Sequence, residues 1–170
     1  MKDFIVENLK KESVLGPSYF TGDTMYDVFL EFKKMLNLKK PDKGQFVLMT
    51  LHRKENIENY QKIKKILDFA KQIANTGHEV VFPIHPHTLK QIRSFRISLS
   101  GITTVDPVKY SEMLRLLCNA NLLLTDSGGL QKEAYWLDTP CITLRKSTEW
   151  IETLDGRHNF LLKTISNSSI

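Results

Sequence analysis

The chain has 170 residues, of which 41% are hydrophobic and 25% are charged, a composition that excludes a disordered or fibrous protein and is typical of one soluble globular domain. No apolar run reaches the ~20 residues that a membrane helix needs, and no apolar signal core follows Met1, so we expect a cytoplasmic protein with no membrane partner. The net charge of +5 permits an anionic partner, but the lysines are dispersed without interleaved aromatics, so solvated helix faces explain them better than nucleic-acid binding. A small phosphorylated ligand also fits a mildly basic protein.

Two helix-like patterns and a turn come first in the chain. Apolar residues recur at helical spacing over residues 1–15 and again over residues 25–36, and a Pro-Asp-Lys-Gly turn occupies residues 41–44. We therefore expect a lead-in of helices at residues 1–40 and a main domain at residues 41–170.

From residue 46 onward, apolar runs of strand length alternate with patterns typical of amphipathic helices. The expected strands cover residues 46–51, 79–84, 102–105, 122–125 and 141–144, with a candidate sixth at 159–162. The expected helices cover residues 57–76, 88–95, 110–120 and 130–137. Strands that are almost entirely apolar and alternate with helices predict a parallel sheet with helices on both faces, which is an α/β, Rossmann-like domain.

Polar side chains follow most of these strands at the point where each strand ends. In order along the chain they are His52, His85, Asp106, Asp126, Ser127 and Arg145. In such sheets the ligand lies beyond the carboxyl ends of the strands, so these side chains are expected on one edge. A single polar residue after a strand is ordinary, because loops are polar, but this combination predicts a phosphate-bearing ligand.

The Ser127-Gly128-Gly129 turn lies between a strand and a helix and is the strongest of these signals. Glycines leave N–H groups open at the start of a helix, where the dipole is positive, so an anion is the expected guest. The structural alternative is a turn that needs glycine only for its dihedral angles. Cys118 and Cys141 lie in apolar runs without ligand spacing, which predicts buried free thiols and no metal site.

Several separate motifs, in this order, resemble the carboxyl-terminal half of the UDP-N-acetylglucosamine 2-epimerase family. They occupy residues 21–27, 50–56, 83–86, 125–134, 140–145 and 147–149. The resemblance implies two Rossmann-like lobes that face a cleft, the glycosyltransferase-B arrangement, with UDP held mainly by the lobe present here.

The family reaction, as the resemblance implies it, eliminates UDP from the sugar and adds it back after a proton returns to the opposite face of C2, with no external cofactor. The carboxylates that move this proton belong to the amino-terminal lobe. Acid–base catalysis depends on geometry before pKa, so we expect this chain to bind UDP but not to epimerise by itself.

The resemblance also implies which residues bind UDP. His85 would meet the diphosphate, which Ser127 and the amides of Gly128 and Gly129 would cradle. Glu133 would accept hydrogen bonds from the ribose hydroxyls.

Further roles implied by the resemblance each have a structural alternative. Met113 would lie against the uracil ring, and a plain core position is an equal alternative. His52 would be the catalytic histidine beside the leaving diphosphate, where a protonated imidazole stabilises charge; a loop residue without function is the alternative for either histidine. Arg53, Arg145 and Glu149 are further candidates near the ligand.

The chain also departs from the family pattern. Trp150 stands where many relatives have an arginine, and Lys132 stands where a second glutamate is common. The tryptophan variant resembles branches that act on other UDP-sugars, such as UDP-2,3-diacetamido-uronic acids, so the sugar stays open. A glycosyltransferase of the same two-lobe architecture and a non-catalytic UDP-binding module are competing hypotheses, and the motif at residues 52–56 favours the epimerase.

The end of the chain is short by the family pattern. It stops soon after Leu162 in a polar tail, residues 166–170. With the first lobe missing, this suggests a fragment or a split gene, and a homodimer is left open.

Overall fold

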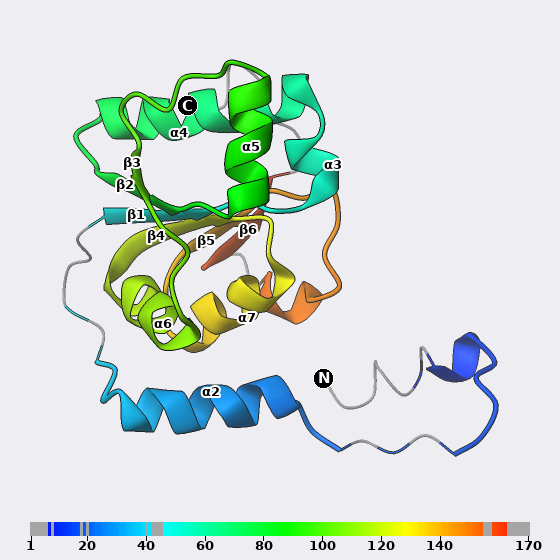
Figure 1. Ribbon diagram of the computed structural model, residues 1–170. Helices are drawn as coiled ribbons and strands as arrows, with labels where there is room; N and C mark the ends of the chain where they lie inside the picture. The colour runs from blue at the N-terminus through cyan, green and yellow to red at the C-terminus, as the bar shows by residue number, and fades with distance from the viewer. Residues whose placement is uncertain are drawn as a thin grey trace. The chain divides into compact units, whose positions relative to one another are not determined.

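The computed structural model describes residues 7, 9–17, 19, 21–39, 41, 46–154 and 158–162 (Figure 1). Two compact units divide the chain, Met1–Met35 and Leu36–Ile170. The expected helix at 1–15 and the expected turn at 41–44 fall partly outside the described residues, and the polar tail falls wholly outside them.

Helix α2, Thr24–Met35, belongs to the first unit. It corresponds to the helix that the sequence predicts at residues 25–36. The Asp23 carboxylate accepts a hydrogen bond from the N–H of Met25 at 3.0 Å, which satisfies a donor at the start of the helix. Lys33 and Lys34 lie in its last turn, where positive charge complements the helix dipole.

The second unit is built on a parallel sheet of six strands, which confirms the predicted Rossmann-like α/β fold. The strands are β1 Phe46–Thr50, β2 Val80–Pro83, β3 Thr103–Val105, β4 Ala120–Thr125, β5 Cys141–Thr143 and β6 Asn159–Leu161. Their order is β3-β2-β1-β4-β5-β6, so the direction of winding reverses between β1 and β4. A doubly wound sheet opens a crevice at this reversal, and ligands bind there.

Helices cover both faces of this sheet (Figure 1). They are α3 Lys54–Ile57, α4 Tyr60–Asn75, α5 Pro86–Ser94, α6 Tyr110–Asn119 and α7 Gly128–Trp136, with a 3₁₀ turn η1 at Ile151–Thr153. Helices α3, α4 and α5 lie on one face, and α6 and α7 lie on the other.

The prediction of one helix over residues 57–76 is wrong at its start. The side chain of Asn59 accepts a hydrogen bond from the N–H of Lys62 at 3.0 Å and caps α4, so the residues before it form the separate short helix α3. Helix α5 begins two residues earlier than expected, because His85 caps it and Pro86 suits its first position. Strand β3 is more exposed than a buried strand should be, since it lies at the edge of the sheet.

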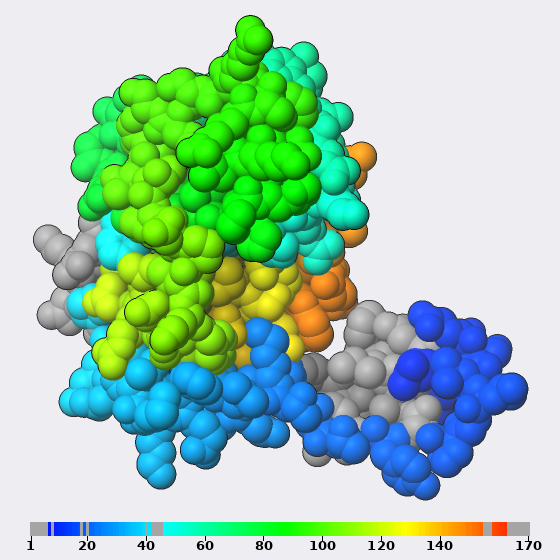
Figure 2. All heavy atoms as spheres, in the orientation of Figure 1, coloured from blue at the N-terminus to red at the C-terminus, as the bar shows by residue number. Residues whose placement is uncertain are grey.

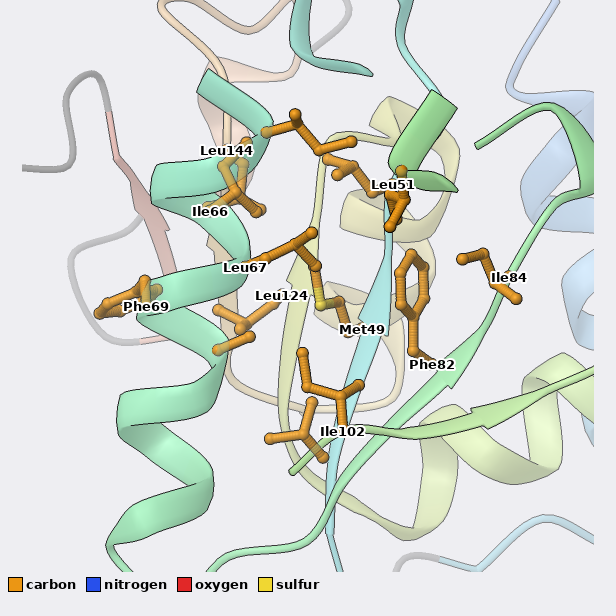
Figure 3. Packing of buried hydrophobic residues seen from close by; sticks show 14 of the residues in the cluster. Met49, Leu51, Ile66, Leu67, Phe69, Phe82, Ile84, Ile102, Leu124 and Leu144 are labelled. Atoms are coloured by element: carbon orange, nitrogen blue, oxygen red, sulfur yellow. The ribbon is translucent and has the colours of Figure 1, made fainter. Parts of the chain in front are cut away.

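Alternate side chains of the central strands enter two different layers of the core. Met49, Phe82 and Leu124 belong to one buried cluster together with Leu67 of α4, as Figure 3 shows. Leu48, which precedes Met49 in β1, is also fully buried but lies outside that cluster. This is expected, because successive side chains of a strand point to opposite faces of the sheet. Among the described residues, no helix combines the length and the apolar character needed to cross a membrane.

Candidate functional site

The last residues of β1 and β4 bring two loops together at the reversal of the sheet. Thr50 and Thr125 are register partners, and their hydroxyl oxygens are 2.6 Å apart in a buried hydrogen bond. The loop that begins at His52 and the turn that begins at Asp126 therefore start side by side, although they are far apart in sequence.

The Asp126 carboxylate is fully buried and organises both loops. It accepts hydrogen bonds from the backbone N–H of His52 at 3.1 Å, from that of Arg53 at 2.9 Å and from the side-chain amide of Asn56 at 3.1 Å. Asn56 also donates to the carbonyl of Leu144 at the end of the next strand. The sequence placed Asp126 on this edge, but only the structure reveals that it holds the edge together.

His52 receives its orientation from the same carboxylate. Its Nδ1 lies 3.2 Å from Oδ1 of Asp126, while its side chain is 53% exposed. A carboxylate at Nδ1 fixes the ring and directs Nε2 away from the carboxylate, which is the arrangement that histidines use as general acids and bases.

A second polar group consists of Arg53, Arg145 and Glu149. Arg53 Nε donates to the carbonyl of Asp126 at 2.8 Å, and its Nη2 lies 3.9 Å from Glu149. Arg145 Nη1 lies 2.8 Å from the other Glu149 oxygen. Burial opposes ionisation of Glu149, but a hydrogen bond with its own backbone and the two guanidinium groups outweigh it and lower its pKa.

Gly128, the first residue of α7, lies against this group. A Cβ atom there would be 2.9 Å from Nε1 of Trp150, 3.0 Å from Oε1 of Glu149 and 3.3 Å from Nη1 of Arg145. The glycine therefore allows polar side chains of the loop between β5 and η1 to approach the start of the helix. A carboxylate beside the first N–H groups of α7 matches the preference of a helix N-terminus for anions.

Ser127 is the N-cap of α7. Its hydroxyl oxygen accepts a hydrogen bond from the N–H of Leu130 at 3.3 Å, and its own N–H donates to Thr125 Oγ1 at 2.9 Å. Because the hydroxyl acts as an acceptor in the cap, its proton can still be donated to an anion.

Glu133, further along α7, is buried, with 2% of its surface exposed. The hydroxyl of Tyr110, at the start of α6, hydrogen-bonds to it. Burial raises the pKa of Glu133 to about 7, against the opposing effects of Tyr110 and Lys132. Burial and the hydrogen bond to Glu133 also raise the pKa of Tyr110. Sequence reasoning missed Tyr110, since a tyrosine at a helix start carries no distinguishing signal.

His52 and Arg53 contact Asp126 directly, and Glu149 joins Arg53 to Arg145 beside Gly128. Gly129 and Glu133 lie on α7 itself, whereas His85 and Met113 lie on other helices or loops. His85 is exposed and caps α5 after the adjacent strand β2, accepting a hydrogen bond from the N–H of His87 at 3.2 Å. Met113 is half-buried on α6, and Gly129 follows Gly128 in the first turn of α7. Figure 2 shows atoms of α7 at the surface between those of α5 and those near residue 150.

The two cysteines take no part in this site. Cys118 and Cys141 are buried free thiols, as predicted, and burial raises the pKa of Cys141 to about 12. Among the residues that the structure describes, no three His, Cys, Asp or Glu side chains are grouped to hold a metal ion.

Comparison with known proteins links this arrangement to one family. The family model described as UDP-N-acetylglucosamine 2-epimerase matches residues 2–170. The chain is 38% identical over 163 residues to a UDP-N-acetylglucosamine 2-epimerase homolog of Methanococcus maripaludis, an alignment that covers 88% of this chain and 45% of the relative.

Two further relatives extend the comparison. The chain is 35% identical to the UDP-2,3-diacetamido-2,3-dideoxy-D-glucuronate 2-epimerase of Pseudomonas aeruginosa, covering 92% of this chain and 46% of the relative. It is similar, with a TM-score of 0.83 and 35% identity, to the crystal structure of Methanocaldococcus jannaschii UDP-GlcNAc 2-epimerase in complex with UDP-GlcNAc and UDP, over 92% of this chain and 47% of that one. The chain thus spans about half the length of the relatives that it matches.

Proposed function

Since the chain belongs to the UDP-N-acetylglucosamine 2-epimerase family, we propose that it is the UDP-binding lobe of an enzyme that interconverts UDP-N-acetylglucosamine and UDP-N-acetylmannosamine. The enzyme would have two Rossmann-like lobes in the glycosyltransferase-B arrangement. The observation that carries this proposal is the convergence of two guanidinium groups, a serine hydroxyl and an oriented histidine on the N-terminus of α7.

The diphosphate would bind where the N-terminus of α7 meets the two arginines. The N–H groups of Gly128 and Gly129 and the hydroxyl proton of Ser127 donate to its oxygens. Arg53 and Arg145 neutralise its charge, and their present partner Glu149 gives way to it. His85, on the next strand end, reaches the diphosphate from the α5 side.

The nucleoside would extend along α7 towards its buried carboxylate. Glu133 accepts hydrogen bonds from the ribose hydroxyls, beside Tyr110. Met113, on the same helix as Tyr110, packs against the uracil ring. A half-buried thioether adapts well to the face of a flat ring.

His52 acts on the departing UDP. Held at Nδ1 by Asp126, its ring stabilises negative charge on the diphosphate as the C–O bond to the sugar breaks. The second requirement of the reaction is proton transfer at C2 of the sugar. We assign that step to carboxylates outside the 170 residues, so the chain binds the UDP-sugar without converting it, and it needs no external cofactor.

An incubation of the purified chain with UDP-N-acetylglucosamine tests this function. We expect binding without formation of UDP-N-acetylmannosamine, which chromatography of the nucleotide sugars detects. A fusion to the part of the Methanococcus maripaludis relative that the alignment leaves uncovered should convert the sugar, and His52→Ala in that fusion should abolish the conversion. Conversion by the unfused chain would refute the division of labour between the lobes.

The similarity to the Pseudomonas aeruginosa enzyme favours a second candidate substrate, a UDP-2,3-diacetamido-uronic acid. Its additional carboxylate and acetamido group would need complementary side chains in the sugar-binding half of the cleft. Parallel assays of the fusion with both UDP-sugars, without any acceptor, distinguish the two and also exclude glycosyl transfer, which requires an acceptor.

A further inference from the structure

Trp150 lies at the N-terminus of α7 with the polar edge of its indole directed at the first turn. Its Nε1 is the atom nearest to the Cβ position of Gly128, at 2.9 Å. An indole N–H is a donor only, and among the described residues no acceptor is hydrogen-bonded to it. An indole donor with no hydrogen-bonded acceptor among the described residues thus lies, like Arg145 Nη1, close to the Cβ position of Gly128 at the start of α7.

Lys132 makes a cation–π contact with the face of the Trp150 ring. The lysine is only 4% exposed, and its Nζ lies 3.9 Å from the centre of the Trp150 ring and 5.2 Å from the centre of the Trp136 ring. Burial of an ammonium group is costly, and two aromatic faces together with the neighbouring Glu133 offset that cost. The cation–π contact therefore restricts the plane in which the Trp150 indole can lie.

A buried hydrogen-bond network fixes the backbone of Trp150 to α7. The Trp150 N–H donates to Thr148 Oγ1 at 3.1 Å, and its carbonyl accepts from Thr153 Oγ1 at 2.7 Å. Both threonines bond to the side-chain amide of Gln131, at 2.9 Å and 2.6 Å. Backbone and ring are thus both immobilised before any ligand arrives, which reduces the entropy lost on binding.

We propose that Trp150 is a diphosphate-binding residue whose Nε1–H donates a hydrogen bond to a phosphate oxygen, and that Lys132 is the residue that positions it. This proposal rests on the proposed UDP site. It adds a neutral donor to the two arginines, in a position fixed relative to the helix N-terminus. The donor recognises the diphosphate and not the nucleoside.

Trp150→Phe removes the N–H and keeps an aromatic face for Lys132. We expect UDP affinity to fall about tenfold or more, because a hydrogen bond to a charged group is lost, while uridine affinity stays within about twofold of wild type. Lys132→Met should weaken UDP binding less, since the donor remains and only its orientation is freed. Thermal unfolding of each variant shows whether it is folded.

Titrations of the wild-type chain with UDP and uridine distinguish a failure of the Trp150 proposal from a failure of the proposed UDP site. If the wild-type chain does not prefer UDP over uridine, the UDP site itself is wrong. If it prefers UDP and Trp150→Phe keeps the full preference, only the role of Trp150 is overturned.

Fluorescence gives a second measurement without changing Trp150. The chain has two tryptophans, so Trp136→Phe leaves Trp150 as the single emitter. Pyrophosphate and UDP should shift its emission, and uridine should not. Binding of UDP in calorimetry without any change in this emission would overturn the proposal.

Discussion

Asp126 fixes the geometry of the ligand edge, because one buried carboxylate accepts hydrogen bonds from two backbone N–H groups of the loop after β1 and from the Asn56 side chain of α3. Asparagine has nearly the same shape as aspartate, but an NH₂ donor replaces one of the two carboxylate oxygens that accept these hydrogen bonds. We expect Asp126→Asn to lower the free energy of unfolding by roughly 1–3 kcal/mol, as buried donors lose their partner. Urea denaturation measures the loss. Glu149→Gln, at a half-exposed carboxylate, is the matched control and should change stability much less.

Glu133 makes stability depend on pH. Its pKa is raised from 4.5 to about 7, so the folded chain holds this proton to a higher pH than the unfolded chain. The contribution of Glu133 to the free energy of unfolding is therefore fully present below pH 4.5 and falls by up to about 3 kcal/mol as the pH rises through 7. Glu133→Gln should remove this loss in urea titrations between about pH 5 and 8. The exposed Glu79→Gln should not, and an unchanged slope in Glu133→Gln would contradict the assignment.

The Glu133 carboxylate should also release a proton when the nucleoside binds. Ribose hydroxyls that donate to Glu133 favour its ionised form, so binding lowers its pKa. Uridine, which has no titrating phosphate, should bind more tightly as the pH rises from about 5 to 7, with release of a proton detectable by calorimetry in buffers of different ionisation enthalpy. Glu133→Gln should bind uridine equally at both values; a pH dependence that survives this change would point to another group.

The first turn of α7 combines the structural and functional requirements of the site. Its cap is Ser127, and its first residue is Gly128, which leaves space for Trp150 and Glu149. Gly128→Ala should leave the unfolding temperature nearly unchanged, since alanine favours helix by up to about 1 kcal/mol while its Cβ crowds these neighbours. UDP affinity should fall at least tenfold in calorimetry. Equal losses of UDP and uridine affinity would mean that the helix itself had shifted.

Elements with strong periodicity could be predicted from the sequence, and elements fixed by distant contacts could not. The strands and helices α4 to α7 have apolar patterns because their apolar side chains pack in the core on the two faces of the sheet. The 3₁₀ turn η1 has no such pattern, because a hydrogen bond to Thr153 from the side-chain amide of Gln131, which is distant in the sequence, holds it in place. Helix α3 is also unpredictable, since four residues are too few to show a period.

At the scale of the whole molecule, strand order explains why the candidate residues were foreseeable. Polar residues after strands of a parallel sheet meet at one edge, so His52 and Ser127 could be placed together from the sequence. Burial could not be foreseen, which is why the hydrogen-bonding role of Asp126 was missed. Lys132 and Trp150, which are separate in the sequence, form one cation–π contact in the structure.

The UDP preference of the chain is the most direct test of the account. Calorimetric titrations of the 170-residue chain with UDP, UMP and uridine, under one set of conditions, compare ligands that differ only in phosphate. We predict affinities in the order UDP, UMP, uridine, with at least about a tenfold gain from uridine to UDP that weakens in high salt. Equal affinity for UDP and uridine would contradict the phosphate site on α7, and with it the proposed function.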